Sequence, residues 1–358
     1  MGHSPLPLNQ DARSGGQARI DGVDAVLGSN EKFKIFDLIN EYSKSEPSCI
    51  HVDTAEQLNE FNSAYSSNND DRTRAFLKIQ DGCDSFCSFC VIPYARGRAR
   101  SREFNNILSE ASQLIKAGYR ELVLTGINVG TYQYKDLSIV EVVESLLELE
   151  GLDRLRLSSI EPTTIPDRLL TVMKEDQRLC HYLHIPLQSG SDDILKAMNR
   201  NYTTLDYADY IRRLQSEIPG ICLGTDVMVG FPGETEDNFQ DTFEFLRELP
   251  LAYFHVFSYS ERPWAKSRKF SNPVQKVVVE ERSRRLRELS NRKRRVFMTD
   301  QLGTIQKVLF EQEKKGWWKG LTDTYMRVKD RSSRNLKNQI LNVQLNQIED
   351  QEIAGTLV

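Results

Sequence analysis

From residue 74 onward, short apolar runs alternate along the chain with longer stretches in which apolar residues recur every three or four positions. The short runs predict β-strands, and the longer stretches predict amphipathic helices. The expected strands are residues 75–79, 121–126, 154–159, 182–187, 222–230 and 253–259. Because strands that alternate with helices build a parallel sheet with helices outside, we expect an α/β fold. An open, partial (β/α)6 barrel over residues 74–300 fits better than a flat doubly wound sheet, although periodicity alone does not separate them. In either fold, catalytic residues belong at the C-terminal ends of the strands.

The two ends of the chain break this alternation. A long basic helix is expected over roughly residues 275–299, and short strands at 304–311, 316–329 and 340–348 follow it. Strands separated by polar turns predict a small all-β barrel over residues 301–358. Residues 1–19 are rich in Gly, Pro and Ser without periodicity and are expected to be disordered. Residues 20–73 read as one strand, one helix and a connector.

Composition and charge narrow the class of protein only a little. The chain has 358 residues, a formal net charge of −4 and six cysteines. Such a charge gives no global sign of a polyanionic partner, and so few cysteines exclude a disulfide scaffold. No apolar run reaches membrane-spanning length and the N-terminus lacks an apolar signal region. We therefore expect a cytoplasmic protein with no membrane contact.

Three cysteines, Cys83, Cys87 and Cys90, stand in the stretch "DGCDSFCSFC" just after the first expected barrel strand. Structural zinc sites use four ligands, usually as paired C-x-x-C units, and no cysteine or histidine lies close enough in sequence to be the fourth. A cubane 4Fe–4S cluster held by three thiolates leaves one iron open to a substrate or cofactor. We therefore expect such a cluster. A zinc site and three unligated structural cysteines are the alternatives.

Further motifs accompany the cysteines: "FLKIQDGCDSFCSFCVIPYARGRARSR", "LVLTGINVGTY", "RLSSIEP", "LHIPLQSGSDDILKAMNRNY", "DVMVGFPGETEDNF" and "HVFSYSERP". Together they resemble the radical S-adenosylmethionine (radical SAM) methylthiotransferases over about residues 20–358. The resemblance implies that the 4Fe–4S cluster binds SAM and cleaves it reductively to a 5′-deoxyadenosyl radical. "LKIQDGC", "TGINVG" and "SSIEP" are most similar to the branch that modifies threonylcarbamoyladenosine in tRNA. The branch acting on isopentenyladenosine is the alternative.

The resemblance also implies a reaction and its partners. The reaction is methylthiolation at C2 of N6-threonylcarbamoyladenosine at position 37 of tRNA, with an electron donor such as flavodoxin or ferredoxin. Family members hold a second 4Fe–4S cluster with three cysteines of an N-terminal domain. This chain enters that domain only near its end and has no second cysteine triplet. We therefore expect either a truncated sequence, which we favour, or a tRNA-binding remnant that cannot insert sulfur.

The motifs that follow the strands supply candidate contacts to SAM. Glycine lets the backbone approach a ligand closely, and a guanidinium can bind a carboxylate or a phosphate. Phe89 can instead be a core aromatic, and "TGINVG" can be an ordinary turn. Glu161 can instead be a solvated loop carboxylate. Arg200 can reach the SAM carboxylate or an RNA phosphate, and a surface arginine without such a contact is its alternative. The residues assigned to the cofactor are Phe89, Gly126, Asn128, Ser159, Glu161, Gln188 and Arg200.

Basic residues gather in two runs although the chain is acidic overall. The first run alternates with small residues beside the cysteines, and in an extended segment alternate residues share one face. The second run, residues 282–295, carries eight basic residues and one acid on the long helix. Such runs are usually solvated, but two of them suggest RNA phosphate contacts. The residues assigned to RNA are Arg96, Arg98, Arg100, Arg102, Arg292, Lys293, Arg294 and Arg295.

Residues 301–358 resemble a TRAM domain, a small RNA-binding β-barrel. Its "GWWKG" segment places Trp317 next to Trp318. Aromatic rings can stack on unpaired bases, so we assign both residues to RNA contact. On a strand only one of two neighbours can face the core, and the outward one needs another partner.

Overall fold

The computed structural model describes residues 25–28, 30–39, 49–52, 61 and 73–358. The expectation for residues 1–19 lies outside these residues, as does most of the predicted connector. Strand β1 (Ala25–Leu27) pairs in parallel with β2 (Cys49–His51). Between them lie η1 (Glu31–Lys34) and α2 (Ile35–Ile39). The predicted division of the chain at residues 74 and 300 stays a prediction.

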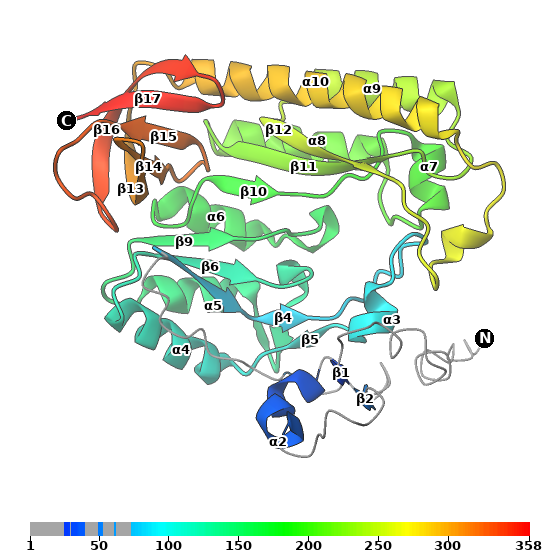
Figure 1. The fold of residues 1–358 in the computed structure, drawn as a ribbon, viewed down its shortest axis with the longest axis horizontal. Helices are drawn as coiled ribbons and strands as arrows, with labels where there is room; N and C mark the ends of the chain where they lie inside the picture. Colours follow the sequence, from blue (N-terminus) through cyan, green and yellow to red (C-terminus); the bar gives the residue numbers. More distant parts are fainter. Residues whose placement is uncertain (1–24, 29, 40–48, 53–60, 62–72) are drawn as a thin grey trace.

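A partial barrel of parallel strands forms the centre of the molecule (Figure 1). Its strands follow the chain order in two three-stranded sheets. Where the sheets meet, Leu155 of the first sheet bridges to Leu179, and Ile160 N donates to the carbonyl oxygen of His184 in the second sheet. The predicted α/β fold and the partial (β/α)6 barrel are therefore confirmed. The strands are β3 (Arg74–Lys78), β6 (Glu121–Thr125), β9 (Arg154–Leu157), β10 (Tyr182–His184), β11 (Cys222–Val229) and β12 (Tyr253–Ser258).

Amphipathic helices cover the outside of this barrel. Helix α5 begins at a capping box, in which the side chains of Ser138 and Glu141 accept hydrogen bonds from backbone N–H groups. Buried leucines, isoleucines and valines of strands and helices form one continuous core between the two layers. The helices are α4 (Phe104–Lys116), α5 (Ile139–Leu147), α6 (Asp167–Glu175), α7 (Asp192–Ala197), α8 (Thr204–Glu217) and α9 (Glu236–Glu248).

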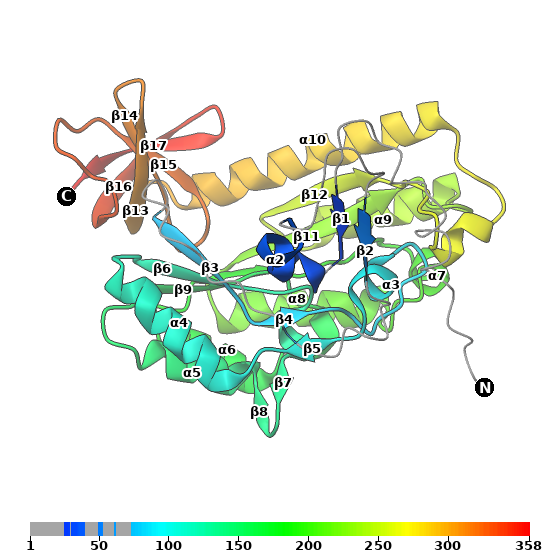
Figure 2. The same ribbon diagram turned by 60° about the horizontal axis from the view of Figure 1, so that its bottom comes forward.

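Helix α10 (Lys276–Asp300) is the long basic helix that the sequence predicts. It packs along β12, where Ser290 Oγ hydrogen-bonds the backbone of Phe254, and it leads to the small barrel (Figure 2). Arg282 is buried in it and pairs with Glu234 at 3.0 Å. None of the helices in the described part of the chain is both long and apolar enough to cross a lipid bilayer.

The C-terminal residues form a closed five-stranded barrel in the order β13-β14-β15-β17-β16, which fits the predicted TRAM-like barrel. The stretch at 316–329 is two strands rather than one, because residues 322–326 turn tightly and Tyr325 has φ 66°. The sequence reading also missed the last strand. The strands are β13 (Ile305–Lys314), β14 (Trp317–Leu321), β15 (Arg327–Asp330), β16 (Ile340–Glu349) and β17 (Glu352–Leu357).

The small barrel sits at the N-terminal ends of the central strands, on the side away from the cysteines (Figure 1). Two buried arginines of β9 hold it there. Arg154 donates to the carbonyl oxygens of residues 307 and 321, and Arg156 donates to those of residues 322 and 323. Arg156 also pairs with the buried Glu121 at 2.7 Å. At these two arginines, charged side chains of the central barrel meet backbone carbonyl oxygens of the small barrel, and Arg74 adds an ion pair with Glu311 at 2.8 Å.

Candidate active site

The cysteine loop begins and ends in a short antiparallel pairing of β4 (Gln80–Asp81) with β5 (Arg100–Ser101). Gly82 opens the loop with φ 73°, and a Cβ there would lie 1.9 Å from the Arg98 carbonyl oxygen. Only glycine fits that position. Asp81 is buried beside it; burial opposes its ionisation, but Lys78, the Gly82 N–H and Arg96 together lower its pKa. Helix α3 (Ile92–Arg96) completes the loop.

Each of the three thiol sulfurs accepts a hydrogen bond from an N–H group. Such bonds stabilise thiolates and tune the potential of the iron–sulfur clusters that they hold. The donors are Ser85 N to Cys83 at 3.5 Å, Ile92 N to Cys90 at 3.4 Å and Arg200 Nη1 to Cys87 at 3.3 Å.

The chemistry of the three donors suits a cluster with one open iron. Among the described residues, one set alone brings three metal-ligating donors within 4.8 Å of one another, and it does not include the cysteines. The three sulfurs are therefore not all within that distance of one another. Three thiolates are the donor set of a 4Fe–4S cluster that keeps one iron open, whereas structural zinc takes four ligands. The donor set therefore fits a three-thiolate cluster.

Burial is the main influence on these thiols in the protein alone. It raises the pKa of Cys87 and of Cys90 above the ordinary thiol value. At Cys87 the charge and hydrogen bond of Arg200 act in the opposite direction. Because the thiolate is the form that ligates metal, Arg200 favours the ligating state of Cys87.

Gln80 links the cysteine loop to the loop that follows β6. Its side-chain amide donates to the Gly82 carbonyl oxygen at 2.8 Å, and its Oε1 accepts from Ile127 N at 2.8 Å. A Cβ on Gly126 would lie 2.9 Å from that Oε1. The close approach that Gly126 permits is thus to Gln80, and its predicted contact with SAM stays a prediction.

Asn128 links the loop after β6 to the loop after β9. Its Oδ1 accepts from Gly130 N, from Glu161 N and from Thr164 Oγ1 at 3.1–3.2 Å. This oxygen is already occupied, so the "TGINVG" segment behaves here as the ordinary turn that was its alternative. Any contact of Asn128 with a ligand would have to come from its amide nitrogen.

Arg200 is not a surface residue, since only 4% of its side chain is exposed. It forms a two-pronged ion pair with Glu161, binds Tyr202 OH at 2.7 Å and reaches Cys87. Burial opposes its charge, but Glu161 outweighs this and raises the pKa of Arg200. Glu161 is therefore not a solvated carboxylate either. Both residues lie at the C-terminal end of the barrel beside the cysteine loop, where we assigned SAM.

The remaining cofactor candidates have mixed surroundings. Phe89 packs against a small apolar cluster that includes Met198 and Phe231, which matches its alternative as a core aromatic. Gln188 has φ 76°, and its backbone bridges to Val227 of β11. Ser159 lines a cavity inside the barrel. Their contacts with SAM stay predictions.

The four arginines beside the cysteines do not share one face, so that prediction is wrong. The segment is not extended, because Arg96 ends α3 and the chain then turns at Gly97, with φ 76°. Arg102 is buried and pairs with Glu110, so it cannot contact RNA. Arg100 and Arg98 have different surroundings. Arg100 pairs with the buried Asp81 at 3.2 Å. Arg98 is largely exposed, so it is the best placed of the four for contact with a phosphate.

The basic residues near the end of α10 also differ in their surroundings. Lys293 donates to the carbonyl oxygens of Arg247 and Leu249 at the end of α9, and burial lowers its pKa to about 8. This lysine therefore serves helix packing rather than RNA. Arg294 lines the cavity between the two barrels. Arg292 and Arg295 are exposed, and their RNA contacts stay predictions.

The two tryptophans of β14 point to opposite sides, as predicted. Trp318 packs on the apolar core of the small barrel. Trp317 lies on the other side, with Lys329 Nζ 4.7 Å and the Arg331 guanidinium carbon 4.5 Å from its ring centroid. The outward ring thus forms a cationic, aromatic surface of the kind that binds single-stranded RNA. RNA contact by Trp318 is disfavoured, since its ring supports the fold.

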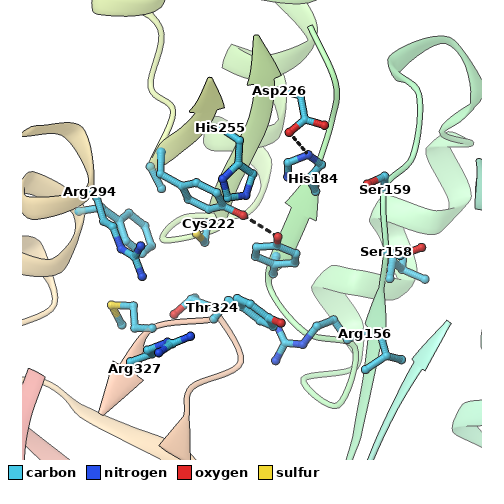
Figure 3. A pocket seen from close by; sticks show the side chains of 18 of the residues that line it. Arg156, Ser158, Ser159, His184, Cys222, Asp226, His255, Arg294, Thr324 and Arg327 are labelled. Atoms are coloured by element: carbon cyan, nitrogen blue, oxygen red, sulfur yellow. Dashed lines mark hydrogen bonds and ion pairs between the residues drawn. The ribbon is translucent and has the colours of Figure 1, made fainter. Parts of the chain in front are cut away.

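A cavity of about 550 Å³ lies between the central barrel and the small barrel. Apolar side chains such as Phe76, Leu157 and Met326 form part of its wall. Figure 3 shows the polar part: Ser158 and Ser159 on one side, His184 and Asp226 above, and Arg294 and Arg327 on the other side. The sequence reading missed most of these residues. The only signal for them was their position in or next to expected strands.

His184, Asp226 and His255 come from adjacent strands and bring their donor atoms within 4.8 Å of one another. His184 Nε2 lies 3.1 Å from Asp226 Oδ1, so a hydrogen bond already explains this closeness. Burial, and then the neighbouring His184, lower the pKa of His255. A neutral His255 can both donate and accept a hydrogen bond within the cavity.

Comparison with known proteins adds the following findings. The Radical SAM superfamily model matches residues 77–246. The chain is similar to the threonylcarbamoyladenosine tRNA methylthiotransferase MtaB of Bacillus subtilis, with 35% identity over 334 residues that cover 91% of this chain and 74% of that protein. It is also similar to the tRNA-2-methylthio-N(6)-dimethylallyladenosine synthase of Acetivibrio thermocellus, with 32% identity over 94% of this chain and 71% of that protein.

Among solved structures, coproporphyrinogen III oxidase (HemN) from Escherichia coli, a radical SAM enzyme, aligns with a TM-score of 0.45 and 17% identity. The alignment covers 65% of this chain and 54% of that chain. A likeness this distant says nothing about the substrate.

Proposed function

Since this chain belongs to the radical SAM methylthiotransferases that modify tRNA, we propose that it adds a methylthio group to C2 of N6-threonylcarbamoyladenosine at position 37 of tRNA. The family uses a 4Fe–4S cluster and SAM. The observation that carries the proposal is the cysteine loop, which presents three hydrogen-bonded thiols at the C-terminal end of a partial barrel.

The choice of nucleoside has weaker support than the chemistry. The named relatives divide between threonylcarbamoyladenosine and dimethylallyladenosine. The relative acting on the first is 35% identical, against 32% for the second. The motifs "TGINVG" and "SSIEP" also favour the first. We therefore propose the threonylcarbamoyl nucleoside.

Cys83, Cys87 and Cys90 would hold the cluster, and SAM would lie beside Arg200 and Glu161. When bound, the cluster and SAM supply a carbon-centred radical that removes a hydrogen atom. Arg200 favours the thiolate form of Cys87 through a charged hydrogen bond, against the effect of burial. No acid–base pair is required of the side chains to break the carbon–hydrogen bond.

The protein's own hydrogen bonds also fix the loops around this site relative to one another. Gln80 ties the cysteine loop to the loop after β6, and Asn128 ties that loop to the backbone of Glu161. Glu161 in turn pairs with Arg200, which reaches Cys87. Hydrogen bonds thus link three loops that follow different strands, which suits a site that must align a cofactor with a substrate carbon.

Contact with tRNA is proposed for the exposed basic and aromatic groups. Arg98 lies on the cysteine loop, Arg292 and Arg295 lie on α10, and Trp317 lies on the small barrel. These groups are suited to phosphates and unpaired bases. The chain as a whole is acidic, so its tRNA contacts must be local.

Nucleoside mass spectrometry of tRNA from a strain lacking the gene tests the proposed function. We expect the 2-methylthio derivative of threonylcarbamoyladenosine to disappear and its precursor to accumulate. The wild-type gene should restore the derivative and Cys87→Ala should not. Cys180→Ala is the matched control, because that thiol is buried far from the loop in sequence and burial raises its pKa to about 12.

Two other results would contradict the proposal. Loss of the methylthio group from the dimethylallyl nucleoside instead would assign the chain to that substrate. Unchanged nucleoside masses, together with tRNA binding by the purified protein, would favour a tRNA-binding protein that cannot insert sulfur.

A further inference from the structure

The cavity between the two barrels contains two arginines without a counter-ion. Arg294 comes from α10 and Arg327 from the start of β15, and both line the cavity. Within the described residues, neither guanidinium forms an ion pair or a hydrogen bond. Both arginines also line a smaller recess together with Asp350 and Glu352, but neither carboxylate pairs with them, and Glu352 instead binds Lys319 at 2.7 Å.

Neighbouring arginines of the same region are all engaged. Arg156 pairs with Glu121 at 2.7 Å, and Arg74 pairs with Glu311 at 2.8 Å. Arg154 donates to backbone carbonyl oxygens of the small barrel. These three therefore serve the joint between the barrels. The two unpartnered guanidiniums stand apart from them and leave local positive charge directed at the cavity.

The cavity extends from the C-terminal end of the central barrel toward the small barrel. Ser158 and Ser159 lie where β9 ends, two residues before Glu161 of the proposed SAM site. Arg327 lies on the small barrel (Figure 3). A nucleoside placed here can turn one edge of its base toward SAM and extend a substituent toward the arginines. The volume, about 550 Å³, is in the range of small-molecule sites.

We propose that Arg294 and Arg327 bind the carboxylate of the threonyl group of the substrate nucleoside and so select it over the dimethylallyl nucleoside. This inference rests on the proposed function. The threonylcarbamoyl substituent ends in a carboxylate and also carries a hydroxyl and amide-like groups, for which His255 is a hydrogen-bonding partner in the same cavity.

The other substituent would be disfavoured for a physical reason. A dimethylallyl group is entirely apolar, so its entry would remove water from two guanidiniums and return no hydrogen bond. Hydrogen bonds to a charged group contribute about 1.5–3 kcal/mol, which corresponds to roughly a tenfold to hundredfold difference in affinity. The two arginines are therefore sufficient to choose between substrates.

The test measures binding of free nucleosides to the full, anaerobically purified chain. The probes are threonylcarbamoyladenosine, its threonine methyl ester and dimethylallyladenosine, with inorganic phosphate as a competitor. For the wild-type protein we expect the free acid to bind at least about tenfold more tightly than the ester. Arg294→Ala and Arg327→Ala should each reduce this ratio, and the double variant should bring it close to one.

Two control variants each remove one arginine that does not line the cavity, so the net charge changes by the same amount as in the single cavity variants. Arg284→Ala removes an exposed arginine of α10 that pairs only with Glu281 and Glu288. Arg334→Ala removes an exposed arginine of the small barrel. Both variants should retain the full ratio of acid to ester. Circular dichroism of all variants establishes that they are folded.

Several results would overturn the inference. These are equal binding of acid and ester by the wild-type protein, no binding of either, or an unchanged ratio in the double variant. Equal displacement of acid and ester by inorganic phosphate would assign the arginines to an RNA phosphate instead. The proposed function is judged separately, by the nucleosides in cellular tRNA, so the two can fail independently.

Discussion

The guanidinium of Arg200 touches a thiol, a carboxylate and a phenol at the same time. It is buried, and its Nη1 donates both to Cys87 Sγ at 3.3 Å and to Glu161 Oε1 at 3.2 Å. A single side chain thus joins the cysteine loop to the loop after β9. Its planar group suits this position better than the flexible ammonium of lysine, because several donors act in fixed directions.

We expect Arg200→Gln to leave iron binding largely intact but to lower reductive SAM cleavage by about tenfold to hundredfold, because partners of metal ligands typically contribute this much. Iron content, visible absorbance and 5′-deoxyadenosine formation measure the two effects separately. Arg178→Gln, which removes a partly exposed ion pair with Asp176, is the matched control. Normal SAM cleavage by Arg200→Gln would contradict the role given to this residue.

At this scale the sequence predicted what is local along the chain. The three cysteines share one loop, so their spacing was sufficient to predict a cluster. Arg200 contacts Cys87 across 113 positions, and no local pattern reveals that its side chain is buried. The prediction for Arg102 was wrong for the same reason, because the burial of its partner Glu110 depends on how α4 packs.

Strand β14 separates two tryptophans that are adjacent in sequence. Trp318 contributes to the core of the small barrel, whereas Trp317 lies between two cationic side chains on the outside. The ring of Trp317 is half-buried and outward-facing, with Lys329 and Arg331 against it, and it remains available to stack on a base. A strand thus divides its neighbouring residues between stability and recognition.

Trp317→Ala should weaken tRNA binding by about tenfold, because base stacking on an aromatic side chain contributes about 1–3 kcal/mol. The unfolding temperature of the Trp317→Ala variant should stay close to that of the wild type. Trp318→Ala should do the reverse, lowering stability with little direct effect on RNA contacts. Filter binding or fluorescence anisotropy at fixed salt measures the first effect, and thermal melts measure the second. Wild-type affinity in Trp317→Ala would remove the ring from the RNA surface.

The elements themselves were largely predictable. The strands of the barrel are short, mainly apolar runs, and the helices between them have clear periodicity, so both were found. The division of residues 316–329 into two strands was missed, because the polar turn at 322–326 contains neither Gly nor Pro. Periodicity also could not predict which basic residues of α10 pack against the protein and which face solvent, because this depends on contacts with α9.

On the scale of the whole molecule, Glu121 is central to the joint between the barrels. It is fully buried and pairs with Arg156 at 2.7 Å, with Arg154 at 3.7 Å on the same carboxylate. Burial alone would raise its pKa, but Arg156 and then Arg154 outweigh burial and lower the pKa of Glu121. The charged form of this residue is therefore part of the folded state.

This lowered pKa fixes the sign of a pH effect. A carboxyl whose pKa falls on folding adds stability above its unfolded pKa, about 4.3, and loses it as the pH drops through the folded value. Glu121→Gln should therefore lower the free energy of unfolding by about 3 kcal/mol at pH 7. The gap between variant and wild type should narrow below about pH 4.

Urea unfolding at several pH values measures this gap. Glu144→Gln, which removes one end of a partly exposed ion pair with Arg168, is the control and should change stability by less than about 0.5 kcal/mol. Equal effects of the two substitutions at pH 7, or a gap that does not depend on pH, would contradict the assigned role of Glu121.

Arg154 and Arg156 hold the small barrel through hydrogen bonds to the carbonyl oxygens of residues 307 and 321–323. Every amino acid carries the same carbonyl, so these hydrogen bonds do not depend on the side chains of the residues that accept them. Glu311 and Tyr325 are different, because their side chains contact Arg74 and Arg156. A small barrel that keeps its backbone path and these two residues should dock in the same place while the rest of its outer sequence changes.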